Sequence, residues 1–145
     1  MMDHLAILKK SWRLGEKILS GEKTIESRWY KQRRAPWNKI KKGDTVYFKN
    51  SGEPVIIKAS VSKVLQLELN PSRVKSTLNQ HYKDLGISKQ NIPKFTDRFR
   101  DKKYCILIFL KNPKKIKPFN IDKKGYGMMA AWISLPDIKQ IKSIR

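Results

Sequence analysis

The chain has 145 residues and a mass of 17.0 kDa, which is the size of one domain. Its 33 lysines and arginines against 12 aspartates and glutamates give a net charge of +21, and 39% of its residues are hydrophobic. This composition supplies one packed core and excludes a disordered basic tail, while no apolar run reaches the ~18 residues that a membrane span needs. The single cysteine, Cys105, excludes an internal disulfide. We expect one domain over residues 1–145 in the cytoplasm, with no membrane contact.

The first third of the chain predicts a strand, a helix and a second strand. The apolar run His4–Lys9 is typical of a strand. Ser11 is expected to cap a helix that ends at Ser20, and Gly21 stands where a left-handed C-terminal cap falls. The following segment, Lys23–Arg28, is compatible with a strand.

The middle of the chain predicts a hairpin and then a helix. Thr45–Lys49 alternates between apolar and polar side chains, and Val55–Leu65 does the same after a turn that contains glycine and proline. Asn70 and Pro71 form a helix start, and the apolar stripe that follows ends at Gly86.

The last third predicts further strands after an irregular segment. Ser88–Lys103 is polar without a clear period, so we expect no regular element there. Tyr104–Leu110 is apolar on both faces, which indicates a central strand covered on two sides. Ala130–Ile133 is expected to form a strand, with a short element after Pro136. Five or six strands and two helices without βαβ alternation predict the α+β class, as a small mixed barrel with helices outside it.

The segment Arg28–Lys42 reads RWYKQRRAPWNKIKK, with seven basic residues, no acidic residue and three interleaved aromatic ones. Aromatic rings stack on bases while basic side chains neutralise phosphates, so this mixture favours contact with RNA or another single-stranded nucleic acid. A solvated surface loop is the alternative. The residues expected to contact nucleic acid are Trp29, Tyr30, Lys31, Arg33, Arg34, Trp37, Lys39, Lys41 and Lys42.

A second cluster of charge lies just before that segment, in the sequence GEKTIESR from Gly21 to Arg28. On a strand, Thr24, Glu26 and Arg28 point to one face, and the bend after Gly21 can turn Lys23 towards Glu26. A carboxylate between two cations stays ionised and holds them in place. The result is a polar pocket able to read a base edge, or else a surface strand with cross-paired charges.

The pattern Gly21-x-Lys23-Thr24-Ile25-Glu26-x-Arg28 resembles the G-x-K-x-x-E-x-R signature of the ASCH domain (activating signal cointegrator homology). The turn and strand beginning at Lys42-Gly43-Asp44 are similar to the segment that follows this signature, and the resemblance extends from His4 to about Leu110. It implies a PUA-like β-barrel with flanking helices. It also implies binding of RNA or a modified nucleoside in a cleft lined by Lys23, Glu26 and Arg28, with Thr24 beside them.

The resemblance also implies a hydrolase as an alternative. One bacterial branch of the family hydrolyses N4-acetylcytidine with a lysine, a threonine and a glutamate, of which Lys23 matches the lysine. Glu26 occupies the threonine position, and no glutamate follows Glu68. For ribonuclease activity, Glu26 is the candidate base and Lys23 and Arg28 the candidate stabilisers of the phosphorane, without a metal.

The remaining reactive residue types predict no second site. We expect His4 at a strand edge, His81 on a helix flank, and no Ser-His-Asp arrangement. Cys105 lies in the most apolar strand, where a thiol has a raised pKa. No glycine-rich phosphate loop or Cys/His ligand set is present, so we expect no cofactor and no metal. A domain that docks on an RNA particle through its basic loop, without a ligand pocket, is a third reading.

Overall fold

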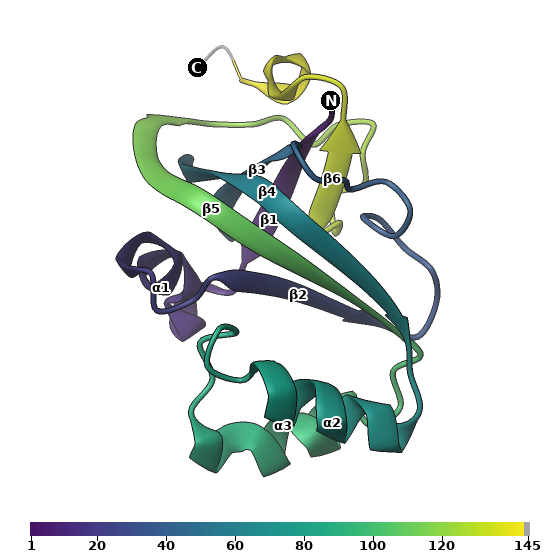
Figure 1. Cartoon of the computed structure of the whole chain (residues 1–145). Coiled ribbons are helices and arrows are strands. Elements are labelled where there is room, and N and C mark those ends of the chain that lie inside the picture. Colours follow the sequence, from purple (N-terminus) through teal and green to yellow (C-terminus); the bar gives the residue numbers. More distant parts are fainter. Residues whose placement is uncertain (144–145) are drawn as a thin grey trace.

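The computed structural model describes residues 1–143, which form one six-stranded sheet with helices on its outer side (Figure 1). The strands are β1 (Asp3–Leu8), β2 (Ile25–Tyr30), β3 (Thr45–Asn50), β4 (Val55–Glu68), β5 (Tyr104–Phe119) and β6 (Trp132–Leu135). The helices are α1 (Leu14–Ser20), α2 (Pro71–His81) and α3 (Ile92–Phe99), with 3-10 helices η1 (Lys10–Trp12), η2 (Lys89–Asn91) and η3 (Ile138–Ile141). Within residues 1–143 no helix has the length and apolar character to cross a membrane.

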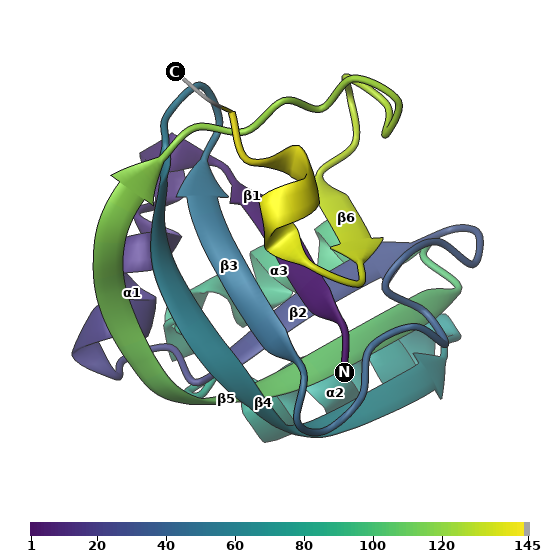
Figure 2. The same cartoon turned by 90° about the horizontal axis from the view of Figure 1, so that it is seen from above.

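The sheet has the order β2-β5-β4-β3-β1-β6, and all of its neighbouring strands are antiparallel except β1 and β3. It curls into a half-barrel, with β2 crossing behind β1 in Figure 2. The predicted α+β barrel, the β3–β4 hairpin and the central position of β5 are confirmed. The half-barrel leaves β2 and β6 as the two edge strands of the sheet.

The two faces of β5 pack against different apolar clusters. Ile106 faces the concave side with Phe48 of β3 and Ile57 of β4. Leu107 faces the opposite side, where it meets Leu78 of α2 and the side chains of α3. Burial on both faces explains why the sequence of this strand is apolar without alternation, as predicted. A third cluster lies beneath η3, on the outer side of β1.

Two sequence predictions about helices are wrong. Ser11 does not cap a helix: it lies in η1, and Arg13, with φ of 54°, separates that turn from α1. The segment Ser88–Lys103 is not irregular, since it contains α3. The spacing of Ile92, Phe95 and Phe99 places one apolar stripe on that helix, a signal hidden by the many charges between them.

His4 differs from the prediction in position and in partners. It is fully buried on β1, which lies between β3 and the edge strand β6, and its ring makes a Ser-His-Asp arrangement that the sequence did not suggest. Trp132 Nε1 donates to His4 Nδ1 at 3.2 Å, which places the proton on Nε2, 2.8 Å from Asp44 Oδ2. Ser134 Oγ lies 2.9 Å from Nδ1. These contacts hold β1 to β6 and to the turn before β3.

The burial of His4 predicts a pH-dependent stability. Desolvation lowers the pKa of His4 below its ordinary value of 6.5, although Asp44 opposes the shift. The unfolded chain therefore binds the proton more readily than the folded one, so stability is full above pH 6.5 and falls as the pH drops below it. We expect the unfolding free energy to decrease from about pH 7 to about pH 5.5, with a slope of at most about 1.4 kcal/mol per pH unit.

Urea denaturation of His4→Gln should show a flatter pH dependence in this range. His81→Gln removes the only other histidine and serves as the control. An equal slope in wild type and His4→Gln would contradict the assignment.

Candidate functional site

A cleft with a volume of about 950 Å³ lies between the edge strand β2, the turn before α1, and α3 with the loop that precedes it. Its size is at the upper end of the range for small-ligand sites. Only two of its lining residues are acidic, Glu22 and Glu26. Eight are basic, namely Lys9, Lys17, Lys23, Arg28, Lys83, Lys94, Arg98 and Lys102. Its aromatic lining residues are Trp12, Trp29, Tyr30, Phe95 and Phe99.

Lys23 enters the floor of the cleft because the chain bends sharply after α1. Gly21 adopts a φ of +83°, a conformation that favours glycine, and the Lys23 amide then donates to Lys17 O at 2.9 Å. The Lys23 side chain is 4% exposed, and its Nζ donates to Ile25 O at 2.7 Å and to Leu85 O at 3.1 Å. Burial lowers the pKa of Lys23, against the opposing effect of Glu26.

The loop after α2 forms the other support of this lysine. Asp84 O accepts hydrogen bonds from the amides of Thr24 and Ile25, at 2.8 and 2.9 Å, and so holds the loop against the start of β2. Gly86 has a φ of +75°, and a Cβ there would lie 3.1 Å from the Cβ of Lys23. The close approach that brings Leu85 O to Lys23 Nζ therefore requires a glycine at position 86.

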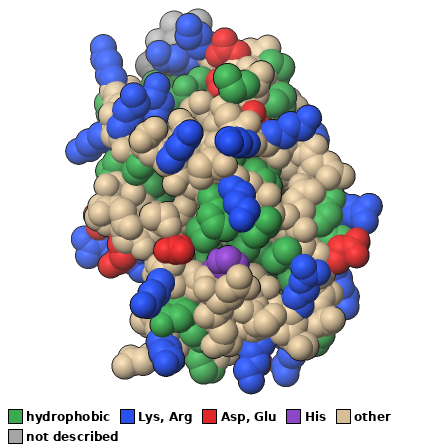
Figure 3. Space-filling view, viewed as in Figure 1, with side chains coloured by type: hydrophobic (Ala, Val, Ile, Leu, Met, Phe, Trp, Pro, Cys, Tyr) green, Lys and Arg blue, Asp and Glu red, His purple; other side chains and the backbone are tan. Residues whose placement is uncertain are grey.

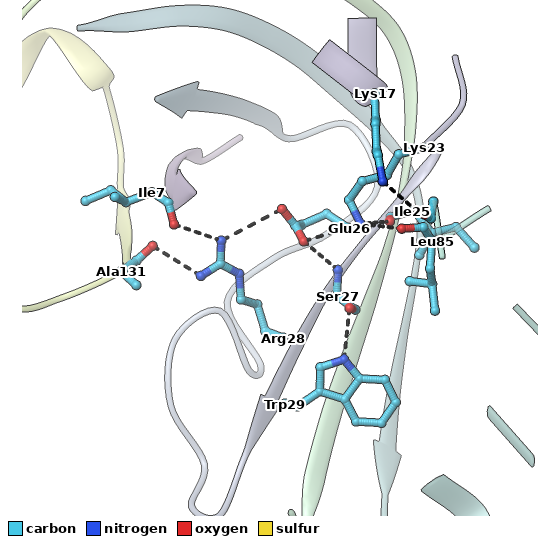
Figure 4. A network of polar contacts seen from close by, with 11 residues as sticks. Ile7, Lys17, Lys23, Ile25, Glu26, Ser27, Arg28, Trp29, Leu85 and Ala131 are labelled. Atoms are coloured by element: carbon cyan, nitrogen blue, oxygen red, sulfur yellow. Dashed lines mark hydrogen bonds and ion pairs between the residues drawn. The ribbon is translucent and has the colours of Figure 1, made fainter. Parts of the chain in front are cut away.

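Glu26 lies between the two cations, as Figure 4 shows. Its Oε1 accepts from the Ser27 amide at 2.8 Å and lies 3.8 Å from Lys23 Nζ. Its Oε2 lies 3.8 Å from Arg28 Nη2 and has no hydrogen-bond partner within residues 1–143, although Glu26 is only 3% exposed. Both separations exceed hydrogen-bonding distance, so Glu26 Oε2 is a buried acceptor whose hydrogen-bonding capacity the described residues do not fill.

Arg28 spans the open side of the half-barrel. Its Nη1 donates to Ala131 O at 3.4 Å and its Nη2 to Ile7 O at 3.5 Å, which links β2 to β1 and to the segment before β6 (Figure 4). Its guanidinium lies 5.1 Å from the centre of the Trp132 ring, and its Nε is buried with no hydrogen-bond partner among the residues that the structure describes. Trp132 itself is 6% exposed and packs in the same apolar cluster as Phe48 and Ile106.

The predicted motif residues do not all reach the cleft. Lys23, Glu26 and Arg28 line it together, whereas the exposed side chain of Thr24 is not among the lining residues. Of the basic and aromatic segment, Trp29 and Tyr30 line the cleft, and Lys41 and Lys42 line a separate, shallow hollow beside β4. The cleft lining does not include Lys31, Arg33, Arg34, Trp37 or Lys39. Arg33 instead pairs with Glu68 at 3.3 Å and lies over the Trp37 and Tyr104 rings.

Several cleft residues were missed by the sequence reasoning because they lie far from the motif in sequence. Phe95, Arg98 and Phe99 belong to α3, which was predicted as irregular. The stripe of Ile92, Phe95 and Phe99 is the signal that could have located them. Most of the rest of the missed lining comes from the segment that runs from the end of β1 into α1 and from the loop after α2, and no local pattern connects those two segments.

These groups present a ligand with a buried acceptor flanked by cations. Lys23 and Arg28 carry two positive charges against the single negative charge of Glu26, so an ionised triad is net positive. Such a site suits a ligand that donates a hydrogen bond to Glu26 and bears acceptors or negative charge around that donor. Across residues 1–143, no group of three or more His, Cys, Asp or Glu is arranged to hold a metal ion.

Known structures share this fold. The ASCH protein of Zymomonas mobilis superposes with a TM-score of 0.67 over 97% of this chain and 96% of its own, at 18% identity. The N-terminal domain of McrB from Staphylothermus marinus superposes with a TM-score of 0.56 over 95% of this chain and 89% of its own, at 16% identity. No family model matches the sequence, and a search of curated proteins gives no match. The chain thus has the fold of an ASCH protein, the PUA-like barrel that the sequence resemblance implied.

The ion triad predicts a coupled effect of mutations on stability. Lys23→Met removes a cation beside a buried carboxylate and leaves two carbonyl groups unpaired, so the unfolding free energy should fall by about 3 kcal/mol. Glu26→Gln should reduce the cost of losing Lys23, because no buried negative charge then remains. Urea denaturation of both single variants and of the double variant should give a coupling of about 1 kcal/mol or more.

The control is Arg100→Met, which breaks an exposed pair with Asp97 and should change stability little. Strict additivity of the two buried substitutions would show that the triad is not an energetic unit.

Proposed function

We propose that this protein binds RNA or a modified nucleotide, with a base at Glu26 and the phosphate backbone along the basic mouth of the cleft. The observation that carries the proposal is the pair of buried, unpartnered atoms Glu26 Oε2 and Arg28 Nε beside the cleft. One is an acceptor and the other a donor, the two functions that a base edge complements. Buried polar atoms are rarely left without a partner, so a ligand that supplies both partners gains affinity.

The charge of the chain supports a polyanionic ligand. Lys and Arg side chains are spread across the surface, with few acidic ones between them, as the face in Figure 3 shows. Two exposed cations at the cleft, Lys94 and Arg98, make no ion pair with a carboxylate within residues 1–143. Cations without acidic partners are available to neutralise phosphates and release counterions. In this proposal the loop between β2 and β3, with Lys31, Arg34 and Lys39, attracts the phosphate backbone, and this contribution to affinity does not depend on the RNA sequence.

A single substitution separates base recognition from charge. Glu26→Gln keeps the size of the side chain and replaces one acceptor oxygen by a donor, so the order of preference among RNA ligands should change while the salt dependence stays near that of wild type. Fluorescence anisotropy against homopolymeric RNA strands at several salt concentrations measures both. Unchanged preference would show that Glu26 does not read a base.

The phosphate contacts have a matched pair of variants. Lys94→Ala removes an exposed lysine at the cleft, and Lys75→Ala removes an exposed lysine on α2 outside it. Loss of one phosphate contact should reduce the slope of log K against log salt by about 0.7 for Lys94→Ala alone, equally for all sequences. Equal slopes for the two variants would contradict a backbone path along the cleft.

The hydrolase alternative draws on a different observation. Burial lowers the pKa of Lys23, and a neutral amine beside Glu26 is a candidate base or nucleophile. Mass spectrometry of an RNA that carries acetylated cytidine, after incubation with wild type and with Lys23→Ala, distinguishes the two functions. Loss of the acetyl group or fragmentation with wild type alone would establish an enzyme, and an unchanged RNA that stays bound would support the binding function.

A further inference from the structure

Trp12 is the exposed aromatic side chain of the cleft. Five large hydrophobic side chains are exposed within residues 1–143, and of these only Trp12 lines the cleft. It is 37% exposed and belongs to none of the three apolar clusters formed by those residues. The core therefore gives no reason for an indole at this position.

Two cationic side chains lie over the Trp12 ring. Arg98 Cζ, from α3, lies 4.5 Å from the ring centre, and Lys9 Nζ, from the end of β1, lies 5.1 Å from it. Both side chains are exposed, and neither forms an ion pair with a carboxylate in the described chain. Exposed cation–π contacts are weak, so a flat ligand can displace either cation from the ring.

Trp29, the other tryptophan of the cleft, is already occupied. Its ring stacks on Phe99 with centres 4.5 Å apart and planes within 4°, and its Nε1 donates to Ser27 Oγ at 2.9 Å. It is 8% exposed, which leaves little surface for a base. Trp29 is thus part of the cleft wall, and Trp12 is the tryptophan whose ring is open to a ligand.

Trp12 and Glu26 sit on different walls. Trp12 belongs to η1 and contacts α3 through Arg98, whereas Glu26 lies in β2 between Lys23 and Arg28. A base held at Glu26 by its edge is fixed by hydrogen bonds, while an aromatic ring with displaceable cations holds a base by its face and the adjacent phosphates by charge. Two successive nucleotides of one strand can meet both conditions, one by the edge of its base and the next by the face of its base.

We propose that Trp12, with Lys9 and Arg98, is a second nucleotide subsite, at which the base adjacent to the one held at Glu26 stacks. The inference rests on the proposed function and specifies its ligand. That ligand is a single-stranded RNA segment with at least two neighbouring bases, and a free nucleoside fills only part of the cleft. Arg98 and Lys9 move from the ring to the flanking phosphates when the base stacks.

The test uses two strands with the same backbone. One is a mixed-sequence RNA of about eight nucleotides, a length within the usual site size of a single-strand-binding module, and the other is its base-free analogue. Trp12→Ala should weaken binding of the RNA on the order of tenfold or more and leave binding of the base-free strand unchanged. Trp12→Phe, which keeps a ring, should retain most of the affinity. Trp12→Leu keeps apolar bulk without a ring and should behave as Trp12→Ala, which covers the case in which alanine impairs folding.

The double variant Trp12→Ala with Glu26→Gln decides whether one base or two are involved. Contacts to different bases should give effects on the dissociation constant that multiply. The inference is overturned if Trp12→Ala binds the RNA as wild type does, if it weakens both strands equally, or if, with an RNA that Glu26→Gln alone weakens, the double variant is no weaker than the weaker single variant. In each of these cases an effect of Glu26→Gln on base preference would still support the proposed function. Wild type that binds no RNA would overturn both.

Discussion

A buried carboxylate organises this molecule, because Glu26 is inside the protein and a charge in that position requires opposite charge around it. Lys23 and Arg28 supply that charge, and each is in turn held by backbone carbonyl groups. Those carbonyls come from β2 itself, from the loop after α2, from the end of β1 and from the segment before β6. The requirements of one side chain thus join four segments that are distant in sequence, and the cleft lies where these segments meet.

The same contacts close the half-barrel. The sheet has two edges, at β2 and β6, and an open edge exposes unpaired backbone groups. Arg28 crosses the opening and packs over Trp132, whose indole nitrogen donates to His4 inside the sheet. A chain of contacts from Arg28 through Trp132 to His4 therefore joins the cleft to the buried residues of the sheet. Because of this connection, the arginine that we propose to bind a ligand is also part of the framework of the fold.

The charge distribution sets the kind of ligand that this framework admits. Glu26 places a carboxylate at one point of the cleft, whereas eight basic side chains line the cleft and make the surroundings of Glu26 positive. A ligand with a polar base and a phosphate backbone matches both parts, since it presents a donor to the carboxylate and negative charge to the rim. Trp12, with Arg98 over its ring, also lines this cleft, which has a volume of about 950 Å³.

The sequence by itself determined the strands, the hairpin, the central position of β5 and the Lys23, Glu26 and Arg28 group, because these depend on alternation, on apolar runs and on residues within one short segment. It failed at α3, where charges hide a three-residue stripe, and at Ser11, where the left-handed Arg13 interrupts the predicted helix. Only the tertiary structure decided that Leu85 O supports Lys23, that Arg28 crosses to Ile7 and Ala131, and that His4 meets Asp44 and Ser134. The physical reason is that local patterns report which face of an element is buried, whereas contacts between elements arise from the curl of the sheet and from loop positions that no local pattern encodes.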